Sequence, residues 1–193
     1  MNRKAMIFSV VAFVGVSLGV GFVVGSSTNK DSNMGMNHGA RSTSMGADEA
    51  MFLQMMIPHH QQAIVISDLA ISISKNEDIL KLANQIKAAQ APEIDQMKSW
   101  LKAAGLGEDP GHSMHAMAGM LSDSQLEQLE NSTGKDFDRQ FLNGMIAHHQ
   151  GAIEMVAMIE NSSDLKLRDF GKQINQSQSG EIEVMKQLLK SIG

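Results

Sequence analysis

The sequence spells one segment twice, and this duplication limits the folds that are open to the chain. "MIPHHQQAI" occupies residues 56–64, and "MIAHHQGAI" occupies residues 145–153. The register continues around both segments, with a one-residue offset in the later part, through matched pairs that include Phe52-Leu53 and Phe141-Leu142, Gln85-Ile86 and Gln173-Ile174, Glu93-Ile94 and Glu181-Ile182, and Met97-Lys98 and Met185-Lys186. Residues 48–105 and 136–193 are therefore two copies of one structural unit.

Each copy has the pattern of a helical hairpin. Apolar residues recur at helical spacing in four arms, which cover residues 48–74, 77–104, 135–160 and 163–192. The turns "SKNED" and "NSSD" separate the arms of each copy and offer helix-capping side chains. A glycine-rich linker and a short helix beginning at Ser122 or Asp123 join the copies over residues 106–135. Because short turns make the arms of each hairpin antiparallel, the sequence predicts an all-α, four-helix bundle over residues 48–193.

The N-terminal segment predicts a membrane anchor. Basic residues precede an uncharged run from Ala5 to Asn29, which is longer than the apolar region of about 7 to 15 residues in a cleaved signal peptide. Its length favours an uncleaved transmembrane helix over residues 1–25, which sends the rest of the chain to the extracytoplasmic side. Residues 26–47 then form a flexible tether. Cleavage near "VVGSS" is the alternative, and it would release a secreted or periplasmic protein.

Charge and cysteine content exclude several classes of function. The formal net charge is −5 and charged residues make up 19% of the chain, so there is no basic stripe for nucleic acid. The chain has no cysteine, which excludes disulfides, thiolate zinc sites, iron–sulfur clusters and cysteine nucleophiles. What remains unusual is a set of 16 Met and 7 His, and these side chains are the candidates for chemistry.

The duplicated histidines are the first candidate metal site. Helical spacing places His60 and His149 within the apolar face of their arms, and His59 and His148 at its border. If the first arms of the two hairpins face each other, the four histidines converge at one level of the bundle. Three methionines lie four residues before a histidine of the segment and share its side of the helix, namely Met55, Met56 and Met145. The alternative is that these histidines are hydrogen-bonded core residues.

Imidazole and thioether together indicate copper. Imidazole binds copper, zinc, iron and nickel, whereas a thioether is a soft ligand that selects Cu(I). The predicted cofactor is therefore copper, with Cu(I) favoured over Cu(II), and the bundle has room for one or two ions.

Methionine and histidine also gather outside the bundle. The linker segment "HSMHAMAGM" contains His112, Met114, His115, Met117 and Met120, and the tether contains Met36 and His38. Methionine in a glycine-rich loop has no packing role, so we interpret both segments as loose Cu(I) capture sites. Drift in low-complexity sequence is the alternative.

The paired "MIxHHQxAI" segments resemble the bacterial family of domains of unknown function number 305. The resemblance spans residues 48–193 and implies an exported, ferritin-like helical bundle, with copper binding or copper tolerance in some members. The residues that match the family pattern are Met56, His59, His60, Met145, His148 and His149. Because of Pro58 in one copy and Gly151 beside the motif in the other, the two halves of the site need not be equivalent.

The sequence as a whole favours a membrane-tethered, extracytoplasmic protein that sequesters or chaperones copper, and not an enzyme. A copper-delivery protein is an expected partner, and a homodimer is an open possibility for a pseudo-symmetric bundle. One alternative is a di-metal oxidase of the ferritin-like type, although the Glu-x-x-His motif of those enzymes does not occur in the sequence. Another is a bundle that binds a protein partner without any metal.

Overall fold

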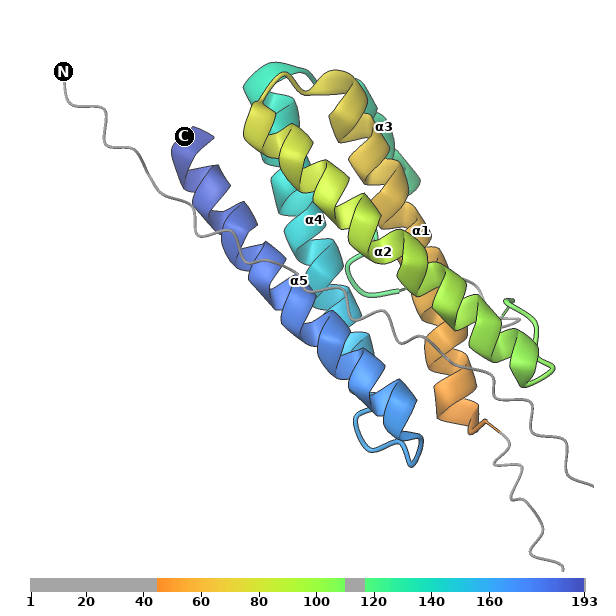
Figure 1. Cartoon of the computed structure of the whole chain (residues 1–193). Coiled ribbons are helices and arrows are strands. Elements are labelled where there is room, and N and C mark those ends of the chain that lie inside the picture. The colour runs from red at the N-terminus through yellow and green to blue at the C-terminus, as the bar shows by residue number, and fades with distance from the viewer. Residues whose placement is uncertain (1–44, 110–116, 193) are drawn as a thin grey trace, which may run out of the picture. The chain divides into compact units, whose positions relative to one another are not determined.

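The computed structural model describes residues 45–109 and 117–192, which fold into five helices without a strand (Figure 1). The helices are α1 (Ala47–Ile73), α2 (Glu77–Ala103), α3 (Asp123–Glu130), α4 (Gly134–Val156) and α5 (Leu165–Ile192). The prediction of an all-α fold is confirmed. Helix α1 continues through Pro58, and the short helix of the linker begins one residue after its cap, Ser122.

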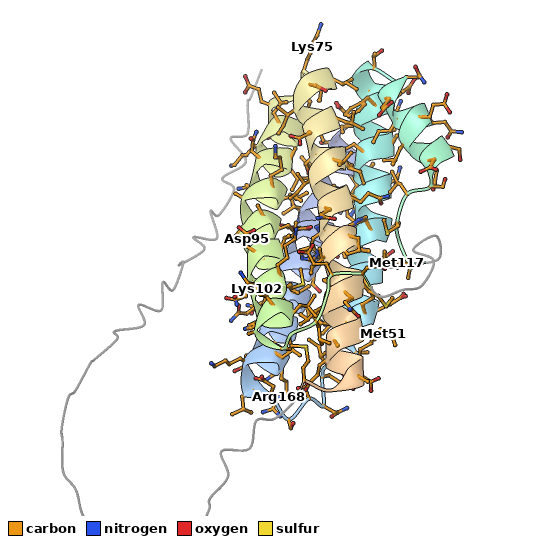
Figure 2. All side chains as sticks on the ribbon, turned by 90° about the vertical axis from the view of Figure 1, so that its right-hand side faces the viewer. Met51, Lys75, Asp95, Lys102, Met117 and Arg168 are labelled. Carbon is orange, nitrogen blue, oxygen red and sulfur yellow. The ribbon has the colours of Figure 1, made fainter. Side chains whose placement is uncertain are left out.

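The four long helices form two antiparallel hairpins that pack against each other through α1 and α4 (Figure 1). Helix α1 packs along α2, α4 packs along α5, and α3 contacts both α1 and α4. The hairpin turns lie at opposite ends of the bundle, since Lys75 in the first turn and Arg168 near the second are at opposite ends in Figure 2. The second arms also meet, because the rings of Trp100 and Phe170 are 5.0 Å apart and perpendicular.

Local signals account for most helix boundaries. The Asn76 side chain accepts a hydrogen bond from the backbone N–H of Asp78 at the start of α2, and Ser122 forms a reciprocal capping box with Gln125 at the start of α3. The second hairpin departs from the prediction. Helix α4 ends at Val156, and the next residues form tighter i→i−3 hydrogen bonds, such as Met158 N to Met155 O.

The apolar core is divided into two clusters, one toward each end of the bundle. The first cluster draws on the C-terminal half of α1, the N-terminal half of α2, the N-terminal half of α4 and the C-terminal half of α5, and its largest members include Ile66, Ile86, Phe137, Phe141 and Met145. The second draws on the remaining halves of the same helices and includes Phe52, Leu53, Met56, Met97 and Phe170. On every long helix the change from one cluster to the other occurs at polar residues.

The predicted anchor over residues 1–25 lies outside the described residues, and so does the predicted tether as far as residue 44. Within residues 45–109 and 117–192, no helix combines the length and the apolar character needed to cross a bilayer. Met45, which the sequence assigns to the tether, packs instead against the second apolar cluster.

Candidate metal centre

A layer of polar side chains crosses the bundle between the two apolar clusters. All four long helices contribute to it, and we call it the histidine layer; its members are His59, His60, Gln90, Glu93, His148, His149, Gln178 and Glu181. The four histidines are 0% exposed, and both glutamines are also buried. A fully buried polar layer in a small bundle weakens the core unless its donors and acceptors are used.

The two hairpins meet in this layer through His59 and His148. Their ring centroids are 3.8 Å apart and the ring planes are tilted by 39°. Each ring is also near its neighbour in sequence, with centroids 6.5 Å apart for His59 and His60 and 6.4 Å apart for His148 and His149. The shortest of these three separations is therefore the one between the hairpins, and we call His59 and His148 the inner pair and His60 and His149 the outer histidines.

The outer histidines, His60 and His149, face carboxylates on the second arm of their own hairpin. His60 Nε2 lies 2.8 Å from Glu93 Oε2, and His149 Nε2 lies 2.6 Å from Glu181 Oε2. Because a carboxylate accepts hydrogen bonds, each Nε2 donates its hydrogen, and neither Nδ1 has a partner within the described residues. The sequence analysis did not assign either glutamate to the site. The available signal was that both glutamates occupy matched positions in the two copies.

In the inner pair, one ring nitrogen of His59 has a partner among the described residues and neither ring nitrogen of His148 has one. His59 Nε2 lies 3.3 Å from the carbonyl oxygen of Ala118, which can only accept a hydrogen bond. His59 Nδ1 and both ring nitrogens of His148 have no hydrogen-bond partner within the described protein. A buried polar group without a partner costs about 1 to 3 kcal/mol, so the inner pair destabilises the metal-free fold.

The unpartnered atoms are concentrated in the histidine layer. Nine buried side-chain nitrogen or oxygen atoms among the described residues lack a partner, and all but the Ser67 hydroxyl belong to the four histidines, Gln90 and Gln178. The two glutamines occupy matched positions in the copies and lie about one helical turn before Glu93 and Glu181. This concentration at one level is the feature expected of a site that binds a ligand.

Burial keeps the inner histidines neutral. The pKa of His59 is lowered to about 3, mainly by desolvation and then by repulsion from His60 and His149, while the hydrogen bond to Ala118 opposes the shift. Desolvation also lowers the pKa of His148 well below 6.5, with repulsion from His59 as the next cause. A neutral imidazole has the lone pair that a metal ion requires, so both rings are competent ligands at pH 7.

Two of the predicted methionines border the layer. Met56 and Met145 are 0% exposed, and each lies one helical turn before a histidine of its own helix. They belong to different apolar clusters, so they flank the layer from opposite sides. Met55 is partly buried at the edge of the second cluster.

The predicted linker and tether sites are only partly described. Met117 and Met120 are half-buried beside the bundle. The other predicted ligands lie outside the described residues, namely Met36, His38, His112, Met114 and His115.

Within residues 45–109 and 117–192, no three side chains from His, Cys, Asp and Glu converge on one point in a way that could hold a metal ion. The layer instead offers two imidazoles in contact, flanked by two buried thioethers. Two nitrogen ligands with a thioether suit a soft ion that accepts a low coordination number, and they do not suit an ion that demands several oxygen ligands.

The chain is similar to known proteins in both sequence and structure. Residues 49–189 match the domain of unknown function DUF305. A DUF305 fragment from Deinococcus radiodurans superposes with a TM-score of 0.72 at 30% identity, covering 76% of this chain and 98% of that one. A candidate secreted DUF305 protein from Streptomyces coelicolor gives 0.71 at 26% identity, covering 78% and 96%. No match is found among curated proteins.

Several similar structures are of a protein called CopM. Its Cu(I)-bound form has a TM-score of 0.62 at 32% identity, covering 76% of this chain and 97% of that one. CopM is also known in a Cu(II)-bound form and in silver-bound forms.

Proposed function

The chain belongs to the DUF305 family, and from this premise we propose that it is an extracytoplasmic copper-binding protein that sequesters or chaperones Cu(I). The ion is cargo rather than a catalytic cofactor. The four-helix, ferritin-like bundle of residues 48–193 holds it in the histidine layer, with His59 and His148 as the central ligands. Met56 and Met145 are the nearest candidates for a thioether ligand.

The contact between His59 and His148 carries the proposal. Two neutral imidazoles from different hairpins touch in the middle of the core, with three ring nitrogens that have no partner among residues 45–109 and 117–192. A pair that served only packing would be better replaced by apolar side chains. The unpartnered nitrogens can coordinate a bound cation, and the cation then links the two halves of the chain.

The relatives support the choice of metal. CopM, at about a third identity, is known with Cu(I), Cu(II) and silver. Ag(I) is a soft monovalent ion like Cu(I), which agrees with the thioethers that flank the layer. We therefore favour Cu(I) as the main cargo and retain Cu(II) as a second form.

The remaining parts of the proposal concern location and exchange. One DUF305 relative is a candidate secreted protein, which agrees with a bundle on the extracytoplasmic side. We propose that residues 1–25 anchor the chain in the membrane, or are removed as a signal, and that Met36 and His38 in the tether and the Met/His-rich linker collect copper for the bundle. A copper-delivery protein is the expected partner, and a homodimer would be compatible with the pseudo-symmetry.

The first test is a metal titration of the full chain with thermal unfolding as readout. At a free Cu(I) concentration one hundred times the Kd, a ligand specific for the folded state adds about 2.7 kcal/mol to the free energy of unfolding. We expect Cu(I) and Ag(I) to raise the melting temperature and Zn(II) to raise it less. An unchanged melting temperature with Cu(I) would reject the proposal and leave a bundle that binds a protein partner without metal.

The carboxylates give a second test. Replacing Glu93 and Glu181 together by glutamine removes the anions that hold the rings of His60 and His149, and the loss of such a partner typically weakens metal affinity by about 10- to 100-fold. The control is Glu154→Gln, which changes an exposed glutamate on α4. Competition with a colorimetric Cu(I) chelator measures the affinity. Equal Cu(I) affinities for the double variant and the control would show that the two glutamates and the histidines they contact are not part of the site.

A further inference from the structure

The end of the linker contacts both α1 and α4 at the level of the histidine layer. We call residues 117–121 the strap, and Figure 2 shows Met117 beside these two helices at mid-height. The Gln62 amide makes two reciprocal hydrogen bonds with the backbone of Leu121, since Nε2 donates to the carbonyl at 2.8 Å and Oε1 accepts from the N–H at 2.8 Å. The start of the linker is also held by α1, because Gln54 Nε2 donates to the carbonyl of Gly107 at 2.8 Å.

Two glycines allow the strap to lie directly on the backbone of α4. Gly119 has a φ of +79°, and a Cβ there would stand 2.2 Å from the carbonyl oxygen of Ala147 and 3.0 Å from His148 Cα. A Cβ on Gly151 would stand 1.9 Å from the carbonyl oxygen of Ala118. The strap is therefore in backbone contact with α4 beside one histidine of the inner pair, while its Ala118 carbonyl reaches the other, His59.

The two copies of the duplicated segment differ where they meet the strap. Gln62 and Gly151 occupy the same position in "HHQQAI" and "HHQGAI". In the first copy the side chain at this position holds the strap, and in the second copy the absence of a side chain makes room for it. A single position thus has two complementary roles around one linker.

We propose that the strap is the cover of the His59–His148 pair and that Gln62 is the positioning residue that keeps it closed. Through the Ala118 carbonyl, the closed strap holds the hydrogen of His59 on Nε2 and leaves Nδ1 free for the ion. Cu(I) reaches and leaves the pair only when the strap lifts, so Gln62 governs the rate of exchange. This inference rests on the proposed copper-binding function.

The test compares exchange rates in two variants with matched controls. Gln62→Ala removes both hydrogen bonds to Leu121, and Gly151→Ala places a methyl group where the Ala118 carbonyl lies. The controls are Gln61→Ala, an exposed neighbour, and Gly180→Ala, a helical glycine of α5 with open space around its Cβ position. Each full-length protein is loaded with Cu(I), and its transfer to an excess of a colorimetric chelator is followed by stopped flow, with uptake measured in the reverse direction.

Loss of two hydrogen bonds should make Cu(I) uptake and release each about tenfold faster in Gln62→Ala, with the equilibrium affinity changed much less. A merely structural role would lower the melting temperature without raising both rates together. Absence of Cu(I) binding by the unmodified protein would overturn the proposed function itself. If the unmodified protein binds Cu(I) but Gln62→Ala exchanges it at the same rates as the controls, the proposal that the strap is a cover is wrong while the proposed function stands. If Gly151→Ala does not fold, the result for Gln62→Ala alone is decisive.

Discussion

Replacing His59 and His148 together by leucine should abolish tight Cu(I) binding and, at the same time, make the metal-free protein more stable. The variant removes both central ligands, so we expect the affinity for Cu(I) to fall by at least about 100-fold, which corresponds to about 2.7 kcal/mol. It also removes three buried ring nitrogens that have no partner in the part of the chain that the structure describes. Leucine fills much of the same volume with apolar groups, so the free energy of unfolding should rise by about 1 to 3 kcal/mol.

Chemical denaturation of the metal-free proteins and chelator competition measure the two effects separately. Ser67→Ala is the matched control, because among the described residues it removes the one unpartnered buried side-chain atom that lies outside the histidine layer. It should leave the Cu(I) affinity unchanged. A double leucine variant that binds Cu(I) as tightly as the unmodified protein would show that the inner pair is core filling. Such opposite changes in stability and binding are expected where a site is built for its ligand.

The metal-free protein should lose stability steeply as the pH falls below about 6.5. In the unfolded chain His59 and His148 take up protons near pH 6.5, whereas burial lowers the pKa of His59 to about 3 and that of His148 well below 6.5 in the fold. The unfolded state therefore binds more protons below pH 6.5, so the free energy of unfolding falls with pH. Each histidine contributes about 1 kcal/mol per pH unit, and for His59 the loss continues to about pH 3.

Urea denaturation between about pH 7.5 and 4.5 without metal checks this expectation. The groups that face the inner pair within the layer are His60 and His149, each beside a carboxylate, and these groups stay in place in the double leucine variant. That variant is therefore the control, and its stability should depend much less on pH. Parallel pH profiles for the two proteins would show that the inner pair is not the origin of the acid sensitivity.

The duplication in the sequence predicted most of the fold. Helical spacing and the capping residues near Asn76 and Ser122 are local signals, and they locate the starts of α2 and α3 within one or two residues. The end of α4 was less predictable, because the tighter turn after Val156 depends on hydrogen bonds within that turn rather than on a stop signal such as glycine.

The sequence predicted the level of the bundle at which the candidate site lies, but not how its side chains are arranged. The helical wheel placed His60 and His149 toward the core and His59 and His148 at its border, yet all four are buried and the border pair meets at the centre. A wheel describes one helix, whereas the contact between α1 and α4 decides which side of each helix faces the other hairpin. The partners of the outer histidines come from other helices.

The strap could not be predicted from the sequence, for a related reason. The position shared by Gln62 and Gly151 looks like ordinary divergence between two copies. The role of this position depends on where the linker packs against the bundle. Residues 118–121 contain no sequence pattern that predicts this.

The complementary pair formed by Gln62 and Gly151 also bears on why both hairpins are parts of one polypeptide. Two identical hairpins that associated as a symmetric dimer would carry the same residue at both positions, so both positions would be glutamine or both would be glycine. When both hairpins belong to one chain, the residues at the two matched positions can differ, and each can contact the single linker in its own way. Joining the halves thus makes the face of the bundle that carries the strap different from the others.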